Sequence, residues 1–420
     1  MKLALFTDTY HPSTNGIVYV IDILYENLVA LGHEVVIIAP RPGLRGRHNP
    51  KLPNKKVVWI PGVEGLLYDE YLVSVFSPTR TARKLSKMNF DLVMFFTPGQ
   101  VGLLGAYVAK QNGIPLVEQY ATDLVEYIKI YPSTLPALLA LSASAPFALK
   151  MNLKEIAEVT RKLMAPRKRQ NTWSQKTTIA ILSGLHNSCD LVICVSEKST
   201  KQLIEQGVKT KIVSIPTGVN RLPVNSKKCK EFKTKYNVSD NDFIVLYVGR
   251  LGKEKNLDML LDAFKIVIKK QPTAKLVMVG DFDYREQLEL KAAATNYSDR
   301  IVFTGRIPRH KLGNVFCSGD VFVFPSLYDT QALVLNEAAC AGLPIVWCDE
   351  PVNEVVQNGI NGILTKPRAK DYAEAIIKLI NDEDLRQQYS VASVKIARQF
   401  TEKKMTKLLI KSLIELIETY

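Results

Sequence analysis

The sequence predicts an α/β protein built from two Rossmann-like, parallel-sheet domains. Its 420 residues are enough for two domains of ordinary size, each with a core of its own. The chain opens with a buried-strand run, Lys2 to Asp8, followed by a loop, an amphipathic helix and a second strand, which together form a βαβ unit. A separate series of strand, glycine turn and helix begins at Phe243. Because βαβ units form parallel sheets with right-handed crossovers, these two beginnings indicate two sheets.

The elements that follow divide the chain into three parts. Further strand runs, at Val57–Ile60, Asp91–Phe95 and Ile114–Glu118, complete a first domain over residues 1–215, which contains an inserted segment at about 132–185. A linker is expected at about 216–225. A second domain over residues 226–398 repeats strand, turn and helix. Residues 399–420 contain an amphipathic helix at Lys403–Ile417.

The composition is that of a globular protein, with 47% hydrophobic and 23% charged residues. The six cysteines form no C-x-x-C pair and lie mostly in apolar runs, which is typical of buried thiols in a reducing compartment. The first residues are too quickly polar for a signal peptide, and no run reaches the roughly 18 apolar residues of a membrane-spanning helix. We therefore expect a cytoplasmic protein.

The charge balance favours an anionic partner. Lys and Arg number 55 against 41 Asp and Glu, a net charge of +14, which suits a membrane leaflet, a nucleic acid or a charged polymer. The sequence contains no zinc spacing, helix-turn-helix signature or aromatic-basic ribonucleoprotein motif, so we expect no nucleic-acid partner.

The most informative stretch runs from Phe324 to Asp349. Asp329 or Thr330 is expected to cap a helix that ends at Gly342, with Pro344 two positions later. The amides of Leu333 and Val334 at its start would offer an anion site. Asp329 and Glu337 stand eight positions apart, roughly 12 Å of helix rise, which is about the span from the sugar to the ribose of a sugar nucleotide. The alternative is an ordinary capped helix with a solvated Glu337.

Two basic residues follow the first strand of the second domain. Arg250 and Lys255 lie five positions apart across a glycine turn and can converge on one diphosphate, Arg through its bidentate fork and Lys as a point charge. The alternative is that both are solvated loop residues. In the first domain, Asn15-Gly16 at a helix start lets a backbone approach a phosphate closely, and the alternative there is a plain turn and cap.

These motifs resemble those of the family 4 retaining glycosyltransferases. Residues 324–349 are similar to the family's E-x7-E segment, which A-x-A-x-G-x-P follows, with Asp329 where the family commonly has Glu and Ala332 where it has Gly. Residues 249–256 match G-R-x-x-x-E-K-N, and Gly16 and Gly280 stand at the family's two glycine turns. The resemblance implies the GT-B fold: two Rossmann-like domains facing across a cleft, with a C-terminal helix that crosses back to the first domain.

The resemblance also implies residue roles. Asp329 would contact the sugar and Glu337 the ribose of a nucleotide-sugar donor. The segment QYATDLVEY is similar to the family's Y-H/Q-T-D-x-x-x-Y on the acceptor side, with Ala121 in place of the His or Gln. Asp123 is the residue to test there, with a simple helix cap as the alternative. Arg306 to Lys311 would flank the nucleotide base. The catalytic set is then Asp329, Arg250, Lys255 and Asp123, and the donor-binding set is Gly16, Arg250, Lys255, Gly280, Asp329, Leu333, Val334 and Glu337.

The same resemblance implies no cofactor and no bound metal, since the cations and the helix start already neutralise a diphosphate. The D-x-D pair Asp281 and Asp283 is expected to be solvated. Transfer would retain the anomeric configuration. The leading interpretation is a hexosyltransferase that uses a UDP- or GDP-sugar and a hydroxyl acceptor. The alternatives are a soluble transferase acting on a polysaccharide, protein or small metabolite, and a non-catalytic nucleotide-sugar binder or an epimerase.

The inserted segment carries a membrane hypothesis. Leu135–Lys150 is apolar, and Trp173 follows a group of basic residues, a combination that can lie on an anionic bilayer surface. The basic residues are Arg161, Lys162, Arg167, Lys168 and Arg169. We therefore expect a glycolipid or lipid-linked acceptor and peripheral association with the inner face of the cell membrane. The alternative is an ordinary helical elaboration packed on the domain.

Overall fold

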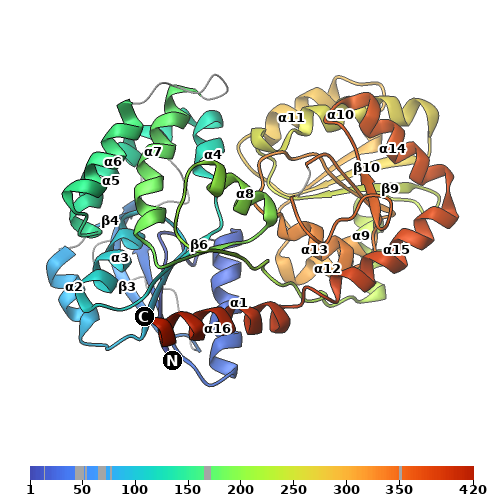
Figure 1. The fold of residues 1–420 in the computed structure, drawn as a ribbon. Helices are drawn as coiled ribbons and strands as arrows, with labels where there is room; N and C mark the ends of the chain where they lie inside the picture. The colour runs from blue at the N-terminus through green and yellow to red at the C-terminus, as the bar shows by residue number, and fades with distance from the viewer. Residues whose placement is uncertain are drawn as a thin grey trace. The chain divides into compact units, whose positions relative to one another are not determined.

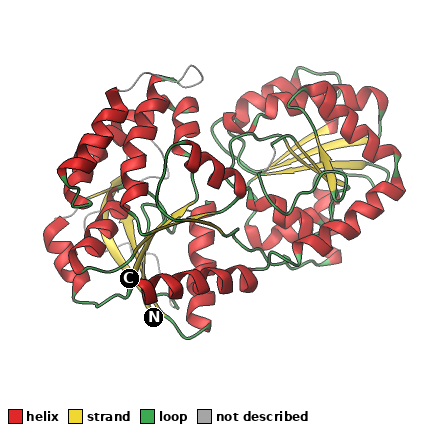
Figure 2. Ribbon diagram, in the orientation of Figure 1, coloured by secondary structure: helices red, strands yellow, loops and turns green. Residues whose placement is uncertain are grey.

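A computed structural model describes residues 1–13, 15–42, 52, 54–64, 72–75, 78–164, 172–349 and 352–420. The chain forms two compact units, each with its own parallel sheet and helices (Figures 1 and 2). The first unit comprises residues 1–217 together with 405–420, and the second comprises residues 218–404. The border after Thr217 falls inside the segment for which the sequence predicts a linker.

The sheet of the first unit has the strand order β4-β3-β2-β1-β5-β6-β7-β8 among the described residues. Every neighbouring pair is parallel except β3 and β4. The order reverses between β1 and β5, and ligands of such sheets bind where the carboxyl ends of the strands diverge at that point. The strands are β1 Lys2–Phe6, β2 Glu34–Pro42, β3 Val57–Glu64, β4 Leu72–Ser74, β5 Leu92–Phe95, β6 Leu116–Tyr120, β7 Leu191–Cys194 and β8 Ile212–Ser214.

Helices connect these strands, and the inserted segment forms helices too. The helices α5, α6 and α7 lie side by side in Figure 1. None of the described helices is long and apolar enough to cross a membrane. The helices of this unit are α1 Gly16–Ala30, α2 Pro78–Ser86, α3 Gln100–Asn112, α4 Leu124–Ile130, η1 Pro132–Thr134, α5 Leu135–Ala148, α6 Leu153–Met164, α7 Trp173–Ser188, α8 Glu197–Glu205 and α16 Glu402–Thr419.

The second unit contains a parallel sheet of order β11-β10-β9-β12-β13-β14, with helices on both of its faces (Figure 2). Its strand order reverses between β9 and β12. The strands are β9 Phe243–Val248, β10 Ala274–Val279, β11 Ile301–Gly305, β12 Val321–Phe324, β13 Ile345–Trp347 and β14 Gly362–Leu364. The helices are α9 Ser226–Lys235, η2 Lys253–Lys255, α10 Leu257–Lys270, α11 Arg285–Ala293, η3 Ser298–Arg300, η4 Arg309–Lys311, α12 Leu312–Phe316, α13 Leu333–Cys340, α14 Ala369–Asn381 and α15 Glu383–Ala397.

The central strands of each sheet are buried because helices cover both faces, which explains why the sequence shows continuous apolar runs there, where a half-exposed strand would alternate. One expectation about the cysteines is wrong. Five of them are buried, whereas Cys317 is exposed, because it lies just past the end of α12 rather than in a strand.

Gly280 follows β10 with φ of +145°, and a Cβ there would lie 1.8 Å from the carbonyl oxygen of Gly249. The backbones after β9 and β10 therefore touch directly. Its amide also donates to the carbonyl of Gly305 at 3.0 Å. The packing between the ends of β9 and β10 therefore requires glycine at position 280, whether or not the residue contacts a ligand.

We predict that Gly280→Ala lowers the free energy of unfolding by about 3 kcal/mol, since the clash adds to the unfavourable backbone angle. Gly359→Ala is the control. Gly359 has φ of +75° but no heavy atom within 4 Å of the added Cβ, so its loss should be about 1 kcal/mol. Urea unfolding measures the loss of stability in both variants. Equal losses would contradict the prediction that the clash at Gly280 adds to the cost of its backbone angle.

Candidate active site

The point where the second sheet reverses its strand order brings three predicted residues to one edge. Arg250 and Lys255 follow β9, and Asp329 follows β12, the strand that pairs with β9. The carboxyl ends of neighbouring parallel strands meet at the same edge of a sheet, and ligands bind there. The structure therefore places these residues where an α/β sheet presents its site.

Lys255 and Asp329 form a buried ion pair. The Nζ of Lys255 lies 2.7 Å from Oδ1 and 2.9 Å from Oδ2 of Asp329, and the two side chains are 11% and 18% exposed. Burial on its own would raise the pKa of Asp329, but the charge and hydrogen bonds of Lys255 outweigh it and lower the pKa below its ordinary value. Asp329 is therefore an ionised acceptor at neutral pH.

A second contact ties the same two loops together. Asn256, in the left-handed conformation at the start of α10, donates its side-chain amide to the carbonyl of Pro325 at 3.2 Å. The loop after β9 and the loop after β12 are thus joined by one ion pair and one neutral hydrogen bond. This bracing fixes where Asp329 points.

Arg250 is held by its neighbours at the rim of the same edge. Its guanidinium lies over the ring of Phe282, 4.9 Å from the centroid, and Nη2 is 3.3 Å from Oε1 of the buried Glu254. The hydroxyl of Tyr247 donates to the carbonyl of Arg250 at 2.8 Å. The sequence analysis missed Glu254 as an orienting residue, although its place four positions after Arg250 was a usable signal.

The helix α13 begins differently from the prediction. Its N-cap is Ala332, in the left-handed region with φ of 55° and ψ of 74°, whose own side chain makes no cap hydrogen bond. Capping by Asp329 or Thr330 is wrong, because the helix starts only at Leu333 and the carboxylate of Asp329 is taken by Lys255. The first-turn amides of Leu333 and Val334 therefore receive no hydrogen bond from the N-cap side chain, and the positive end of a helix is where an anion binds.

Glu337 pairs with a residue that the sequence analysis did not single out. Its Oε1 accepts a hydrogen bond from Nε of Arg309 at 2.9 Å, and Nη2 of the same guanidinium lies 2.6 Å away in the ion pair. Burial raises the pKa of Glu337, and the charge and hydrogen bonds of Arg309 oppose that rise. Arg309 lies within 306–311, the segment expected beside the nucleotide base. The spacing from Asp329 to Glu337 is only partly helical, so the helix-rise length does not apply to it.

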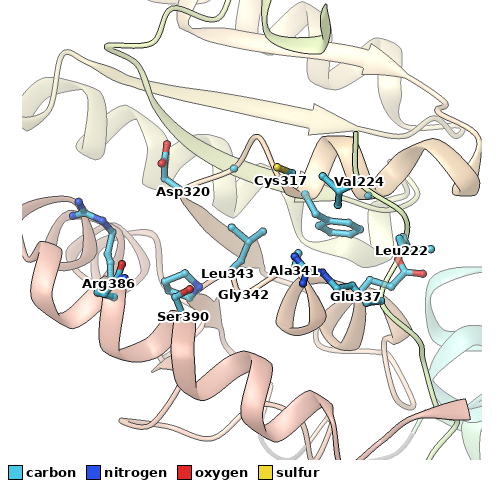
Figure 3. A pocket seen from close by; sticks show the side chains of 16 residues that line it. Leu222, Val224, Cys317, Asp320, Glu337, Ala341, Gly342, Leu343, Arg386 and Ser390 are labelled. Carbon is cyan, nitrogen blue, oxygen red and sulfur yellow. The ribbon is translucent and has the colours of Figure 1, made fainter. Parts of the chain in front are cut away.

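Glu337 also borders a cavity of about 260 Å³ (Figure 3). In Figure 3, Glu337 of α13 and Ala341 just past its end face it together with Arg386 and Ser390 of α15. The cavity lies at the amino ends of β12 and β13, because Asp320 and Pro344 immediately precede those strands. Arg250, Lys255 and Asp329 do not line it. This cavity is therefore separate from the edge that carries the ion pair.

Side chains satisfy the starts of two helices in the first unit, α1 and α3. Asn15 caps α1, and its Oδ1 accepts from the amides of Ile17 and Val18 at 3.1 Å each. A Cβ at Gly16 would meet no heavy atom within 4 Å, so Gly16 leaves open space, although the cap has taken two nearby amides. The phosphate role of Gly16 stays a prediction.

Asp8, a residue the sequence analysis did not single out, closes the start of α3. Its carboxylate accepts from Oγ1 of Thr97 at 2.6 Å and from three backbone amides at 2.7 to 3.2 Å, those of Gly99, Val101 and Gly102. Burial raises the pKa of Asp8, and these four donors oppose the rise. Its place directly after the first strand was the only signal in the sequence.

Asp123 is buried and caps α4, as its alternative interpretation held. Its Oδ1 accepts from the amides of Val125 and Glu126 at 3.0 and 3.1 Å. Burial raises the pKa of Asp123, and the two backbone hydrogen bonds oppose it. Its catalytic assignment stays a prediction. In the D-x-D pair, Asp281 Oδ2 lies 3.3 Å from Nη1 of Arg285. Within the described ranges, no group of three or more His, Cys, Asp or Glu side chains could hold a metal.

Comparison with known families agrees with this geometry. The model described as Glycosyltransferase Family 4 matches residues 14–221, and the model described as Glycosyl transferases group 1 matches residues 229–395. Between them the two matches span most of the chain. It belongs to the family 4 glycosyltransferases.

Relatives and solved structures extend this result. The alpha-monoglucosyldiacylglycerol synthase of Acholeplasma laidlawii is 27% identical over 371 residues, 86% of this chain and 84% of that protein. The synthase of the same name from Streptococcus pneumoniae is 24% identical over 370 residues, 87% of this chain and 75% of that protein. The Anabaena protein HepE, solved with UDP and glucose, has a TM-score of 0.71 at 16% identity and covers 98% of this chain and 99% of its own. The predicted GT-B fold is confirmed.

We predict that Asp329→Asn lowers the free energy of unfolding by about 3 kcal/mol, because it leaves the ammonium of Lys255 buried without its counter-ion. The double variant Lys255→Met/Asp329→Asn should recover most of that loss. Because the folded pKa of Asp329 lies below its ordinary value of 3.8, the pair stabilises the fold above that pH. The difference in free energy of unfolding between wild type and Asp329→Asn should shrink only as the pH falls through the lowered pKa of Asp329.

Urea unfolding across this pH range measures the effect. The exposed pair Lys411–Glu415 is the control: Glu415→Gln should change the free energy of unfolding by less than about 0.5 kcal/mol. A loss at Asp329→Asn no larger than that of the control would contradict a stabilising buried pair.

Proposed function

We propose that this glycosyltransferase moves a hexose from a UDP- or GDP-sugar, with retention of anomeric configuration, to a hydroxyl of a glycolipid or lipid-linked acceptor at a membrane surface. The observation that carries the proposal is the Lys255–Asp329 pair beside the start of α13, whose N-cap side chain makes no cap hydrogen bond. The carboxylate of Asp329, the cations Arg250 and Lys255, and the start of α13 lie at one edge of the sheet. This combination suits a sugar joined to a diphosphate.

Each group has a distinct task in this proposal. The amides of Leu333 and Val334 donate hydrogen bonds to the diphosphate, and the guanidinium of Arg250 donates two more. Lys255 balances Asp329 and offers its remaining donor to a phosphate oxygen. Asp329, ionised and already oriented, accepts from the hydroxyls of the sugar. Glu337, braced by Arg309, accepts from the ribose hydroxyls of the nucleotide.

The chemistry follows from where charge develops. As the bond between the anomeric carbon and the phosphate oxygen breaks, negative charge collects on the diphosphate, and donors fixed in advance stabilise it without reorganisation. The acceptor hydroxyl attacks on the leaving-group side, and the departing phosphate oxygen takes its proton. In this scheme the chain supplies the electrostatic field and the positions, and no side chain forms a covalent intermediate.

The membrane part rests on the inserted helices and on the relatives' names. No residue of α6 is buried, and its ends, Leu153 and Met164, are highly exposed. Phe147 of α5 and Trp173 of α7 are exposed as well. Lys154, Arg161 and Lys162 add positive charge on α6. Exposed apolar and basic side chains together favour an anionic lipid surface. Of the predicted basic cluster, Arg167, Lys168 and Arg169 lie outside the described residues.

We predict that Arg250→Ala lowers kcat/KM for the donor about 100-fold, since it removes a donor from the developing charge. Release of nucleoside diphosphate from a panel of UDP- and GDP-hexoses, with dioctanoylglycerol as acceptor, is the measurement. Arg285→Ala is the control, because Arg285 makes surface ion pairs with Asp281 and Glu289 and should leave the rate unchanged. Undiminished turnover in both Arg250→Ala and Glu337→Ala would refute the proposed donor site.

We predict that Met164→Ser/Trp173→Ser weakens binding to vesicles containing anionic phosphatidylglycerol about tenfold, because two apolar side chains no longer enter the bilayer surface. Flotation with and without the anionic lipid measures this. Leu290→Ser/Val391→Ser is the matched control, since both are equally exposed apolar residues of the second unit. Flotation that is the same for wild type and both double variants would refute this surface.

A further inference from the structure

A buried histidine and glutamate lie at the carboxyl end of β6 in the first unit. His186 of α7 and Glu118 of β6 have side chains only 2% and 4% exposed, and Nδ1 of His186 is 2.7 Å from Oε2 of Glu118. The ring of Tyr120 packs edge-on against the imidazole, with centroids 5.6 Å apart. None of these contacts is used in the transfer scheme proposed above.

The contact with Glu118 fixes which nitrogen of His186 carries the proton. A carboxylate only accepts, so the Nδ1 of the neutral imidazole must be the N–H donor. The thiol of Cys189 points to the same carboxylate oxygen at 3.9 Å, which is again a donor facing an acceptor. The Nε2 of His186 then carries a lone pair and is a hydrogen-bond acceptor.

That acceptor has no partner among the described residues. The Nε2 of His186 is buried and makes no hydrogen bond there. Leaving a buried acceptor unmatched is unfavourable, so folding alone gives no reason for it. His186 also lines a small pocket, and this is the space from which a donor can reach Nε2.

The pocket admits one small polar group. It is bordered by Phe96 and Pro98 after β5, by residues 118–122 at the end of β6, and by Leu182 of α7. Its volume is about 10 Å³, the room for a single oxygen-centred group. Ala121 contributes to the wall, and its small side chain keeps the space open. An anion does not fit the chemistry, because it cannot donate to Nε2.

We propose that this pocket is a hydroxyl subsite for the acceptor, in which a hydroxyl of the acceptor other than the attacking one donates a hydrogen bond to Nε2 of His186. Glu118 is a positioning residue that holds the imidazole in the accepting tautomer. This inference rests on the proposed function, because it assigns a place to the hydroxyl-bearing substrate. A hydroxyl is the neutral donor that is small enough, and it costs less to desolvate than an amine cation.

The first test observes the imidazole directly and needs no turnover. The chain has five histidines, so 15N-histidine NMR can assign His186 through the signal that is lost in His186→Asn. We expect the Nδ1–H tautomer and a shift of the Nε2 resonance when glucosyl-dioctanoylglycerol, a glycolipid with several hydroxyls, is added in mixed micelles. An Nε2–H tautomer, or a resonance that does not move, would overturn the proposal and leave at most a trapped water in the pocket.

The second test separates acceptor binding from donor binding. His186→Asn and Glu118→Gln should raise the KM for glucosyl-dioctanoylglycerol about fivefold to tenfold, the effect of one neutral hydrogen bond, with the donor KM moving less than about twofold. Ala121→Val, which fills the pocket from a half-exposed position, should do the same if the buried variants fold poorly. Equal acceptor KM values in Ala121→Val and wild type would count against the subsite.

Cys189→Ser is the matched control. Cys189 contacts the same Glu118 oxygen but does not line the pocket, so this variant should keep the wild-type acceptor KM. A rise there equal to that of His186→Asn would show a packing effect and overturn the assignment. If wild type releases no nucleoside diphosphate but the Nε2 resonance still shifts, the proposed function fails while the hydroxyl subsite stands.

Discussion

The ion pair between Lys255 and Asp329 is the constraint on which the candidate site depends. Two loops that follow neighbouring strands, β9 and β12, each contribute one charge, and either charge alone would be unfavourable at that depth. The pair keeps Asp329 ionised and gives it one orientation. A pair of this kind specifies geometry more than it adds stability, and geometry is what a carboxylate needs if it is to recognise a sugar.

The two units differ at the sheet edge where each strand order reverses. In the first unit, Asn15 caps α1 and Asp8 accepts from the amides at the start of α3. In the second unit, the acidic side chain at the corresponding sheet edge, Asp329, turns away to Lys255, and the N-cap of α13, Ala332, makes no side-chain cap hydrogen bond. An anion can therefore bind at the start of α13. This difference explains why the diphosphate is assigned to the second unit, although both sheets have the same topology at their reversal points.

A second buried pair, Glu118 and His186, lies at the end of β6. Glu118 orients His186 much as Lys255 orients Asp329, because in each case one buried partner fixes the position of the other. The acceptor at Asp329 suits the hydroxyls of a charged donor molecule. The acceptor at His186 suits a single hydroxyl in a space too small for a phosphate. Both sites therefore use buried pairs to hold hydrogen-bond acceptors in place.

The sequence by itself determined the two α/β domains, because buried parallel strands must be apolar on both faces and glycine turns must follow them. It also determined Arg250, Lys255, Asp329 and Glu337 as candidates, since their spacing around strand ends is local information. Only the tertiary structure decided the pairings. Lys255 and Asp329 are 74 positions apart, and Glu118 and His186 are 68 apart. The start of α13 depended on such a pairing as well: the carboxylate expected to cap it is held by a distant lysine, and no local pattern records a contact that only strand order creates.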